Sequence, residues 1–213
     1  MKVLVIQNRM GIGDMVIFIP YIDAISKYFK VPVSLLVKEN TKSTEFLSSS
    51  PSIDKIITLE RDDKKKIGRH YGLKGILNLA SDVKKYNFDK VFIFNSSFRY
   101  ALIARLAKVK DIYQYKLFNK KNQHIIKTAK LFIKTNLDIE VESNPIISIS
   151  SNKIKKAKNK YNILNDSINI LLGIGGSGPT KRVPPEKFIE FIKLCNKKYK
   201  CNFFLAAGSN KIE

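Results

Sequence analysis

The sequence predicts an α/β protein whose parallel sheet is covered by helices on both faces. Short apolar runs rich in Val and Ile alternate with longer segments in which apolar residues recur at helical spacing. The runs are apolar almost without interruption, which is typical of strands that are buried on both faces rather than on one. Regular alternation of strand and helix along a chain is the pattern of a parallel sheet with helices on both sides.

Turn and capping residues place the boundaries of five strand–helix pairs. Gly11 and Gly13 interrupt the chain before the first helix, Thr41 is suited to cap a short second helix, and residues 50–52 (Ser-Pro-Ser) form a turn before the third strand. A charged loop over 61–72 precedes the third helix. The expected strands are 2–7, 31–37, 53–59, 90–95 and 111–115, and the helices that follow them are 14–29, 41–49, 73–86, 98–109 and 123–135.

A second region begins after residues 143–145 (Ser-Asn-Pro), which end the helical pattern. Its expected elements are a short strand at 146–149, a polar lysine-rich helix at 153–161, and then a strand at 168–173, a helix at 185–199 and a strand at 202–207. Two strands and one helix cannot enclose a core of their own. We therefore expect 1–150 to be a complete N-terminal domain, 151–165 a linker, and 166–213 the start of an incomplete C-terminal domain.

Length and composition exclude several classes of protein. With 213 residues, 44% of them hydrophobic, the chain can build a core and wholesale disorder is excluded. No apolar run approaches the roughly 20 residues that span a membrane, and Asn8, Arg9 and Asp14 follow the first run where a signal peptide would continue. Cys195 and Cys201 match no zinc spacing and no disulfide framework, so a cytoplasmic location is expected.

The net charge of +21 is concentrated in the middle of the chain. Residues 61–160 carry 24 Lys and Arg against 8 Asp and Glu, whereas residues 1–60 carry 7 against 6. Such a surface indicates an anionic partner: nucleic acid, an anionic membrane surface or a phosphorylated substrate. Only 6 of the 39 basic residues are Arg, and readout of base edges favours the planar fork of Arg, so nucleic acid is not expected. Alternatively, many of these lysines are simply solvated.

The loop after the first strand carries a candidate catalytic carboxylate. In an open α/β sheet, ligands bind beyond the carboxyl ends of the strands, where Asp14 lies. One interpretation makes Asp14 the N-cap of the first helix. The other makes it a general base, because Gly11 and Gly13 beside it allow a ligand to approach the backbone.

A glycine-rich segment at 173–178 (Gly-Ile-Gly-Gly-Ser-Gly) follows a predicted strand. Its letters match the G-x-G-x-x-G fingerprint of dinucleotide-binding proteins, but its context does not. In that fingerprint the helix begins inside the motif and the next strand ends in an acidic residue, whereas here prolines delay the start of the helix and the next strand ends without an acidic residue. Flexible backbone, hydroxyls, two cations and a helix N-terminus nevertheless converge here, and these groups suit a diphosphate. An ordinary turn with solvated cations is the alternative. The polar residues are Ser177, Thr180, Lys181 and Arg182.

Basic residues also gather after the third strand, on the same edge of the predicted sheet. They are either a solvated loop or a binding surface for phosphate or carboxylate groups. His70 and His124 are the only histidines, and neither has Cys or carboxylate partners at ligand spacing, so no metal is expected. The basic residues of this loop include Arg61, Lys64, Lys65, Lys66 and Arg69.

Two of these segments together resemble a known family. Residues 9–16 (Arg-Met-Gly-Ile-Gly-Asp-Met-Val), with Pro20 after them, are similar to the opening signature of the ADP-heptose:lipopolysaccharide heptosyltransferases, glycosyltransferase family 9. Residues 175–188 resemble that family's strand–loop–Lys-Arg-Trp-Pro–helix segment, with Val183 where Trp is usual, and 203–208 with Glu213 resembles its following strand and loop. The two motifs in this order span most of the chain.

The resemblance implies a GT-B architecture of two Rossmann-like domains, with the acceptor on the first and the sugar nucleotide on the second. It implies an inverting transfer of a heptose or related sugar from a nucleotide-sugar donor, ADP-heptose, with Asp14 as the catalytic base. The implied donor-binding residues are Ser177, Thr180, Lys181 and Glu213. The implied acceptor-binding residues are Gly13, Arg61, Lys64, Lys65 and Arg69.

The resemblance also implies the surroundings of the reaction. The acceptor is a phosphorylated lipid A–core molecule at the membrane surface, which predicts a cytoplasmic protein that is peripheral on the inner face of the cytoplasmic membrane. No cofactor or metal is expected. Because the family continues beyond the segments matched here, residues 1–213 alone are expected to bind donor weakly and to turn over little.

Two alternatives remain open at the level of sequence. One is a non-catalytic basic α/β module that binds nucleic acid or an anionic membrane surface. The other is a different enzyme on the same fold, such as an epimerase.

Overall fold

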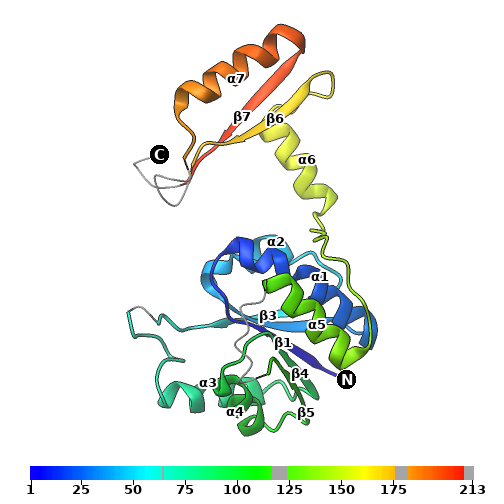
Figure 1. Ribbon diagram of the computed structural model, residues 1–213, viewed down its shortest axis with the longest axis vertical. Coiled ribbons are helices and arrows are strands. Elements are labelled where there is room, and N and C mark those ends of the chain that lie inside the picture. The colour runs from blue at the N-terminus through cyan, green and yellow to red at the C-terminus, as the bar shows by residue number, and fades with distance from the viewer. Residues whose placement is uncertain (64, 117–123, 176–181, 209–213) are drawn as a thin grey trace. The chain divides into compact units, whose positions relative to one another are not determined.

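The structure is a computed structural model that describes residues 1–63, 65–116, 124–175 and 182–208 (Figure 1). The chain forms two compact units, Met1–Ile149 and Ser150–Glu213, and each is described by itself. None of the helices in the described ranges is long and apolar enough to cross a membrane.

The first unit contains a five-stranded sheet in which all neighbouring strands are parallel (Figure 1). Its order is β3-β2-β1-β4-β5, so the first strand lies at the centre and the chain winds outward from it in both directions. Every residue of β1 and β2 is buried, as the uninterrupted apolar runs predict. The strands are β1 Val3–Gln7, β2 Val33–Lys38, β3 Ile53–Leu59, β4 Lys90–Ile93 and β5 Asp111–Gln114.

Helices cover both faces of this sheet. Alternate residues of β1 separate into two cores: Val3 and Val5 belong to one, and Leu4 and Ile6 to the other. The first core is packed under α1 Ile12–Phe29, the short α2 Ser43–Leu47 and α5 Ile125–Leu137, and the second under α3 Lys74–Lys84 and α4 Phe98–Leu106 (Figure 1). A single turn of 3-10 helix, η1 Glu39–Thr41, precedes α2.

Two sequence expectations about the first unit are wrong. Asp14 is not the N-cap of α1: the helix begins at Ile12, and Gly11, with φ 96°, takes the cap position. The predicted strand at 146–149 is absent. Ile146 and Ile149 are 74% and 58% exposed in a segment without regular structure, because an apolar run becomes a strand only beside a partner that satisfies its backbone.

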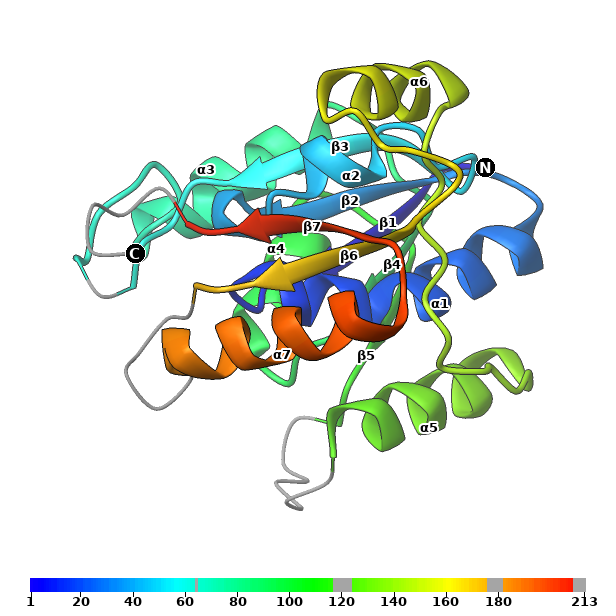
Figure 2. The ribbon, with the colours of Figure 1, turned by 90° about the horizontal axis from the view of Figure 1, so that it is seen from above.

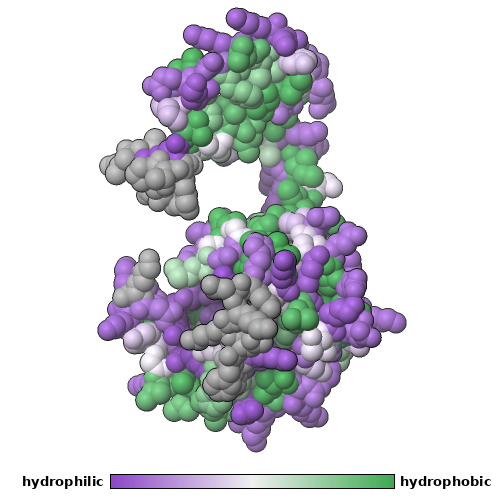
Figure 3. Space-filling view, in the orientation of Figure 1, coloured by the Kyte–Doolittle hydropathy of each residue, from purple (hydrophilic) through white to green (hydrophobic). Residues whose placement is uncertain are grey.

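The second unit contains two parallel strands, β6 Ile168–Gly173 and β7 Cys201–Ala206, with α7 Pro185–Lys198 between them in sequence (Figure 2). Helix α6 Ser151–Lys160 precedes them within the predicted linker. Among the described residues of this unit, Leu172 is the only buried hydrophobic one. Leu171 and Leu205 are 71% and 62% exposed, and Figure 3 shows hydrophobic surface over this part of the chain.

Candidate functional site

Side-chain amides tie together three loops at the carboxyl edge of the first sheet. Asn95, after β4, donates from Nδ2 to Oδ1 of Asn8, after β1, at 3.0 Å. Gln114, the last residue of β5, donates from Nε2 to the carbonyl oxygens of Asn95 and Ser97 at 2.9 and 2.8 Å. The order reverses between β1 and β4, and this is where an open α/β sheet binds its ligands.

Asp14 lies at this edge, in the first turn of α1, and is half-buried. The position places its carboxylate near the positive end of the helix dipole. A Cβ built on Gly11 or on Gly13 would meet no heavy atom of the described chain within 4 Å. The backbone at these two glycines is therefore open to the approach of a ligand, and a carboxylate one residue further on is a candidate general base.

A pocket of about 450 Å³ opens at the same edge, between the ends of β4 and β5 and helix α5. Its lining includes two cations together with hydroxyl and amide groups, so it suits a polar ligand that carries negative charge. Arg9, which lines the pocket, lies in the loop directly before the helix that carries Asp14. Its lining residues are Arg9, Ser96, Gln114, Tyr115, Lys116, Ile125, Thr128, Leu131, Phe132, Thr135 and Asn136.

Two buried polar side chains of the first unit are not satisfied, and one of them, Tyr115, lines this pocket. Within the described chain, no hydrogen-bond partner is found for the hydroxyl of Tyr115 or for either side-chain polar atom of Gln7, which is fully buried at the end of β1. Burial raises the pKa of Tyr115 well above its usual range, and the nearby charge of Arg9 opposes this only in part. An unpaired buried hydroxyl costs free energy unless a ligand or water pairs with it.

The basic loop after β3 has a defined structure. Asp62 and Ile67 exchange backbone hydrogen bonds of 3.0 and 3.2 Å, and the backbone of Lys65 donates to Oδ1 of Asp62 at 3.1 Å. Gly68 adopts φ 113°, and a Cβ there would lie 2.4 Å from the carbonyl oxygen of Glu60. Only glycine fits at such a position.

Asp63 links this loop to the neighbouring strand. It lies 3.0 Å from Nζ of Lys38, the last residue of β2, and 2.6 Å from Nε of Arg61. Burial opposes ionisation of Asp63, but its hydrogen bond with Lys38 and the charge of Arg61 outweigh that effect and lower its pKa. Arg61 is thus held over the sheet edge by one carboxylate.

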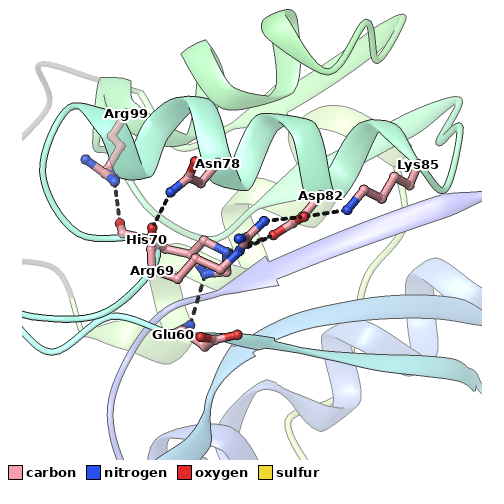
Figure 4. Close-up of polar contacts among 7 residues, drawn as sticks. All are labelled: Glu60, Arg69, His70, Asn78, Asp82, Lys85 and Arg99. Atoms are coloured by element: carbon pink, nitrogen blue, oxygen red, sulfur yellow. Dashed lines mark hydrogen bonds and ion pairs between the residues drawn. The ribbon is translucent and has the colours of Figure 1, made fainter.

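The other end of the loop is anchored on α3 (Figure 4). Arg69 donates from Nε and Nη2 to the two oxygens of Asp82, both at 3.0 Å. The buried ring of His70 accepts the Glu60 N–H at Nδ1, at 3.1 Å, so that Nε2 carries a hydrogen and donates to Asp82 at 3.2 Å. The pair of hydrogen bonds from Arg69, with further ones from Lys85 and His70, holds the pKa of Asp82 well below its usual range although burial raises it.

Four of the five predicted acceptor-binding residues are described, and they differ in their surroundings. Gly13 is exposed, Arg61 is paired with Asp63, and the Lys65 side chain is exposed. Arg69 is engaged with Asp82. Lys64 lies outside the described residues, as do all four predicted donor-binding residues, Ser177, Thr180, Lys181 and Glu213.

The histidines have structural roles: His70 anchors the basic loop, and His124 caps α5 by accepting the N–H of Ile126 at 3.4 Å. In the described part of the chain, no cluster of three His, Cys, Asp or Glu residues could hold a metal ion. Sequence reasoning missed the pocket beside α5. The polar residues after the fifth strand, from Gln114 to Lys116, were the signal that could have revealed it.

Solved structures share the fold of this chain, whereas no protein-family model and no curated protein sequence matches it. A glycosyl transferase of family 9 from Veillonella parvula is 18% identical, with a TM-score of 0.70 over 95% of this chain and 62% of that one. The E. coli ADP-heptose LPS heptosyltransferase II is 18% identical, with a TM-score of 0.63 over 96% of this chain and 64% of that one. E. coli heptosyltransferase WaaC with ADP is 15% identical, with a TM-score of 0.64 over 99% and 69%.

These likenesses confirm the predicted fold class, an α/β protein with the Rossmann-like parallel sheet of GT-B glycosyltransferases. The chain spans 62% and 64% of the length of the first two structures. At 15% to 18% identity, similarity of structure defines the fold and not the reaction.

Proposed function

We propose that this protein is an inverting glycosyltransferase that moves a heptose or a related sugar from ADP-heptose to a lipopolysaccharide core acceptor. The observation that carries the proposal is the position of Asp14, a carboxylate in the first turn of α1 that follows two glycines with open backbone at the carboxyl edge of the first sheet. The fold of solved glycosyltransferases supports it.

Asp14 serves as the general base in this proposal. Its carboxylate takes the proton from an acceptor hydroxyl, whose oxygen attacks the anomeric carbon of the donor sugar. A new C–O bond forms as the bond to the diphosphate breaks, and attack from the opposite side inverts the anomeric centre. The diphosphate leaves with an additional negative charge. We assign the stabilisation of that charge to Lys181 and Thr180, assisted by Ser177, and we assign to Glu213 the binding of the donor ribose.

The acceptor lies on the first unit in this proposal. The pocket with Arg9 and Tyr115 receives a sugar, and the basic loop receives its anionic groups through Gly13, Arg61, Lys64 and Lys65. Arg69 donates two hydrogen bonds to Asp82, so we propose that Arg69 holds the basic loop in place and does not contact the acceptor. An acceptor that is part of a lipid requires the protein to work as a peripheral protein at the cytoplasmic face of the membrane.

The test is release of ADP from ADP-heptose by the complete gene product, measured with and without Kdo-lipid A as acceptor. Asp14→Asn is expected to lower the acceptor-dependent rate by about 10²–10⁴-fold, the contribution typical of a positioned general base. Asp23→Asn, a half-buried carboxylate further along α1, is the matched control and is expected to keep the rate.

Two results would contradict the proposal. One is an Asp14→Asn protein as active as the control. The other is a wild-type protein that releases no ADP with any nucleotide-sugar and acceptor pair yet binds RNA or DNA tightly, which would identify a basic binding module.

A further inference from the structure

The segment that contains the basic loop and the start of α3 exposes aliphatic and basic side chains together. Ile67 is 57% exposed, Leu73 84% and Leu77 62%. Three lysines of the same segment are exposed as well. We call this set the basic–apolar surface: Lys65, Lys66, Ile67, Leu73, Lys74 and Leu77.

Hydrogen bonds hold this segment in place. Nδ2 of Asn78 donates to the carbonyl oxygen of Arg69 at 2.9 Å, and Arg99 donates to the carbonyl oxygens of Gly72 and His70 at 2.9 and 2.6 Å (Figure 4). Its aliphatic side chains are therefore presented outward by an ordered backbone. Exposed side chains of this size gain free energy when a partner covers them.

The two leucines of the basic–apolar surface share one helix face. Leu73 and Leu77 are four residues apart at the start of α3, a spacing that puts both on the same helix face. Lys74 stands between them in sequence, and the turn with Lys66 and Ile67 precedes them. Figure 3 shows hydrophobic surface beside hydrophilic surface where α3 lies in Figure 1.

We propose that the basic–apolar surface docks on an anionic lipid bilayer. The aliphatic side chains enter the boundary of headgroups and acyl chains, and the lysines stay with the lipid phosphates. Charge complementarity favours this occupant, since the middle section of the chain carries a net charge of +16 and the inner leaflet is anionic. The inference rests on the proposed function for its purpose, which is to bring the acceptor edge to a lipid-borne substrate.

Other partners fit the surface less well. Nucleic acid would be expected to meet aromatic side chains or Arg, on which bases stack, whereas this surface has three aliphatic side chains and three lysines. A second copy of this chain would bring the same basic residues together, and like charges repel.

The first experiment measures binding of the purified chain to vesicles by flotation. Phosphatidylcholine vesicles with and without phosphatidylglycerol are compared, and binding is expected only to those with phosphatidylglycerol. The whole chain carries +21, so charge alone does not identify the docking surface. Substitution of the two exposed leucines tests whether this surface is the one that docks. The double substitution Leu73→Ser with Leu77→Ser is expected to lower the partition coefficient between vesicles and water by about tenfold or more.

A matched control keeps the number of exposed aliphatic residues equal. Ile146 and Ile149 are 74% and 58% exposed elsewhere in the same unit, and Ile146→Ser with Ile149→Ser is expected to leave the partition coefficient unchanged. Lys66→Glu with Lys74→Glu should weaken binding more than Lys127→Glu with Lys130→Glu on α5. Circular dichroism confirms that each variant is folded.

A second experiment uses the absence of tryptophan from the sequence. Leu73→Trp introduces a single tryptophan on the surface, and the emission of that tryptophan, excited selectively over tyrosine, is expected to shift to shorter wavelength when phosphatidylglycerol vesicles are added. Ile146→Trp is expected to show no shift.

The inference is overturned if the Leu73 and Leu77 variants bind vesicles as tightly as the wild type, or if both Trp probes behave alike. Self-association that the Leu73 and Leu77 substitutions abolish, without vesicle binding, overturns it as well and assigns the surface to a second copy. None of these measurements needs turnover, so vesicle binding and transferase activity can fail independently.

Discussion

Single residues at the edge of the first sheet are held by partners that differ in kind. Asp14 owes its position to the helix that starts two residues before it, with open space on the side of the glycines. Arg61 and Arg69 are each positioned by an ion pair, Arg61 with Asp63 and Arg69 with Asp82, and each carboxylate partly neutralises the charge of its arginine. In the proposed function, Asp14 is the reactive group, and the paired guanidinium groups of Arg61 and Arg69 hold the basic loop in place.

Gly68 in the basic loop and Gly13 in the first turn of α1 are expected to respond oppositely to alanine. Gly68→Ala puts a Cβ 2.4 Å from the Glu60 carbonyl oxygen at φ 113° and should destabilise the protein by about 1–3 kcal/mol. Gly13→Ala meets open space inside α1 and should be neutral or stabilising by up to about 1 kcal/mol. Urea denaturation measures both, and a Gly68→Ala protein as stable as the wild type would show that the loop backbone can rearrange.

Whole elements show where local patterns are sufficient. The strand at 53–59 was predicted at its observed bounds, and the first helix was predicted to end at Phe29, as it does. These segments carry their periodicity and their turn residues within a few positions of the chain. The expected strand at 146–149 fails because strand formation depends on a neighbour that the local sequence does not specify.

Helix α3 and the basic loop are expected to separate on acidification. The pKa of Asp82 in the folded protein is below its value in the unfolded chain, so its ion pairs stabilise the fold above the unfolded pKa of about 3.9. That contribution is lost as the pH falls from the unfolded pKa toward the lower pKa of Asp82 in the folded protein. Between about pH 5 and pH 3, Asp82→Asn should lose less stability than the wild type in denaturant unfolding. An equal loss in both proteins would mean that Asp82 does not hold the loop.

At the scale of the whole molecule, the two units differ in how much core they contain. The first unit buries two apolar clusters, one on each face of its sheet. The second has one buried hydrophobic residue, Leu172, among those described, and its strands and helix leave many apolar side chains exposed. Hydrophobic burial is the main stabilising contribution in a small domain, so the two units should differ in stability.

Hydrogen exchange on the intact chain tests this difference. Backbone amides of β1 and β2 are expected to exchange at least about a hundredfold more slowly than those of β6 and β7, because opening the second unit exposes little additional apolar surface. Similar protection in the two sheets would contradict the expectation and would show that the second unit is stabilised by contacts beyond its own.

The sequence by itself determined the fold class, most element bounds in the first unit and the position of Asp14 at the carboxyl edge of the first sheet. Apolar periodicity and turn residues act over a few positions, so they can be read directly from the chain. Only the tertiary structure decided that Asp14 is not a cap, that Arg69 is paired with Asp82, that a pocket lies beside α5, and that Leu73 and Leu77 face outward. Some of these features depend on contacts between residues that are distant in sequence, and others depend on which helix faces remain exposed after packing. Neither can be predicted from the pattern of neighbouring residues along the chain.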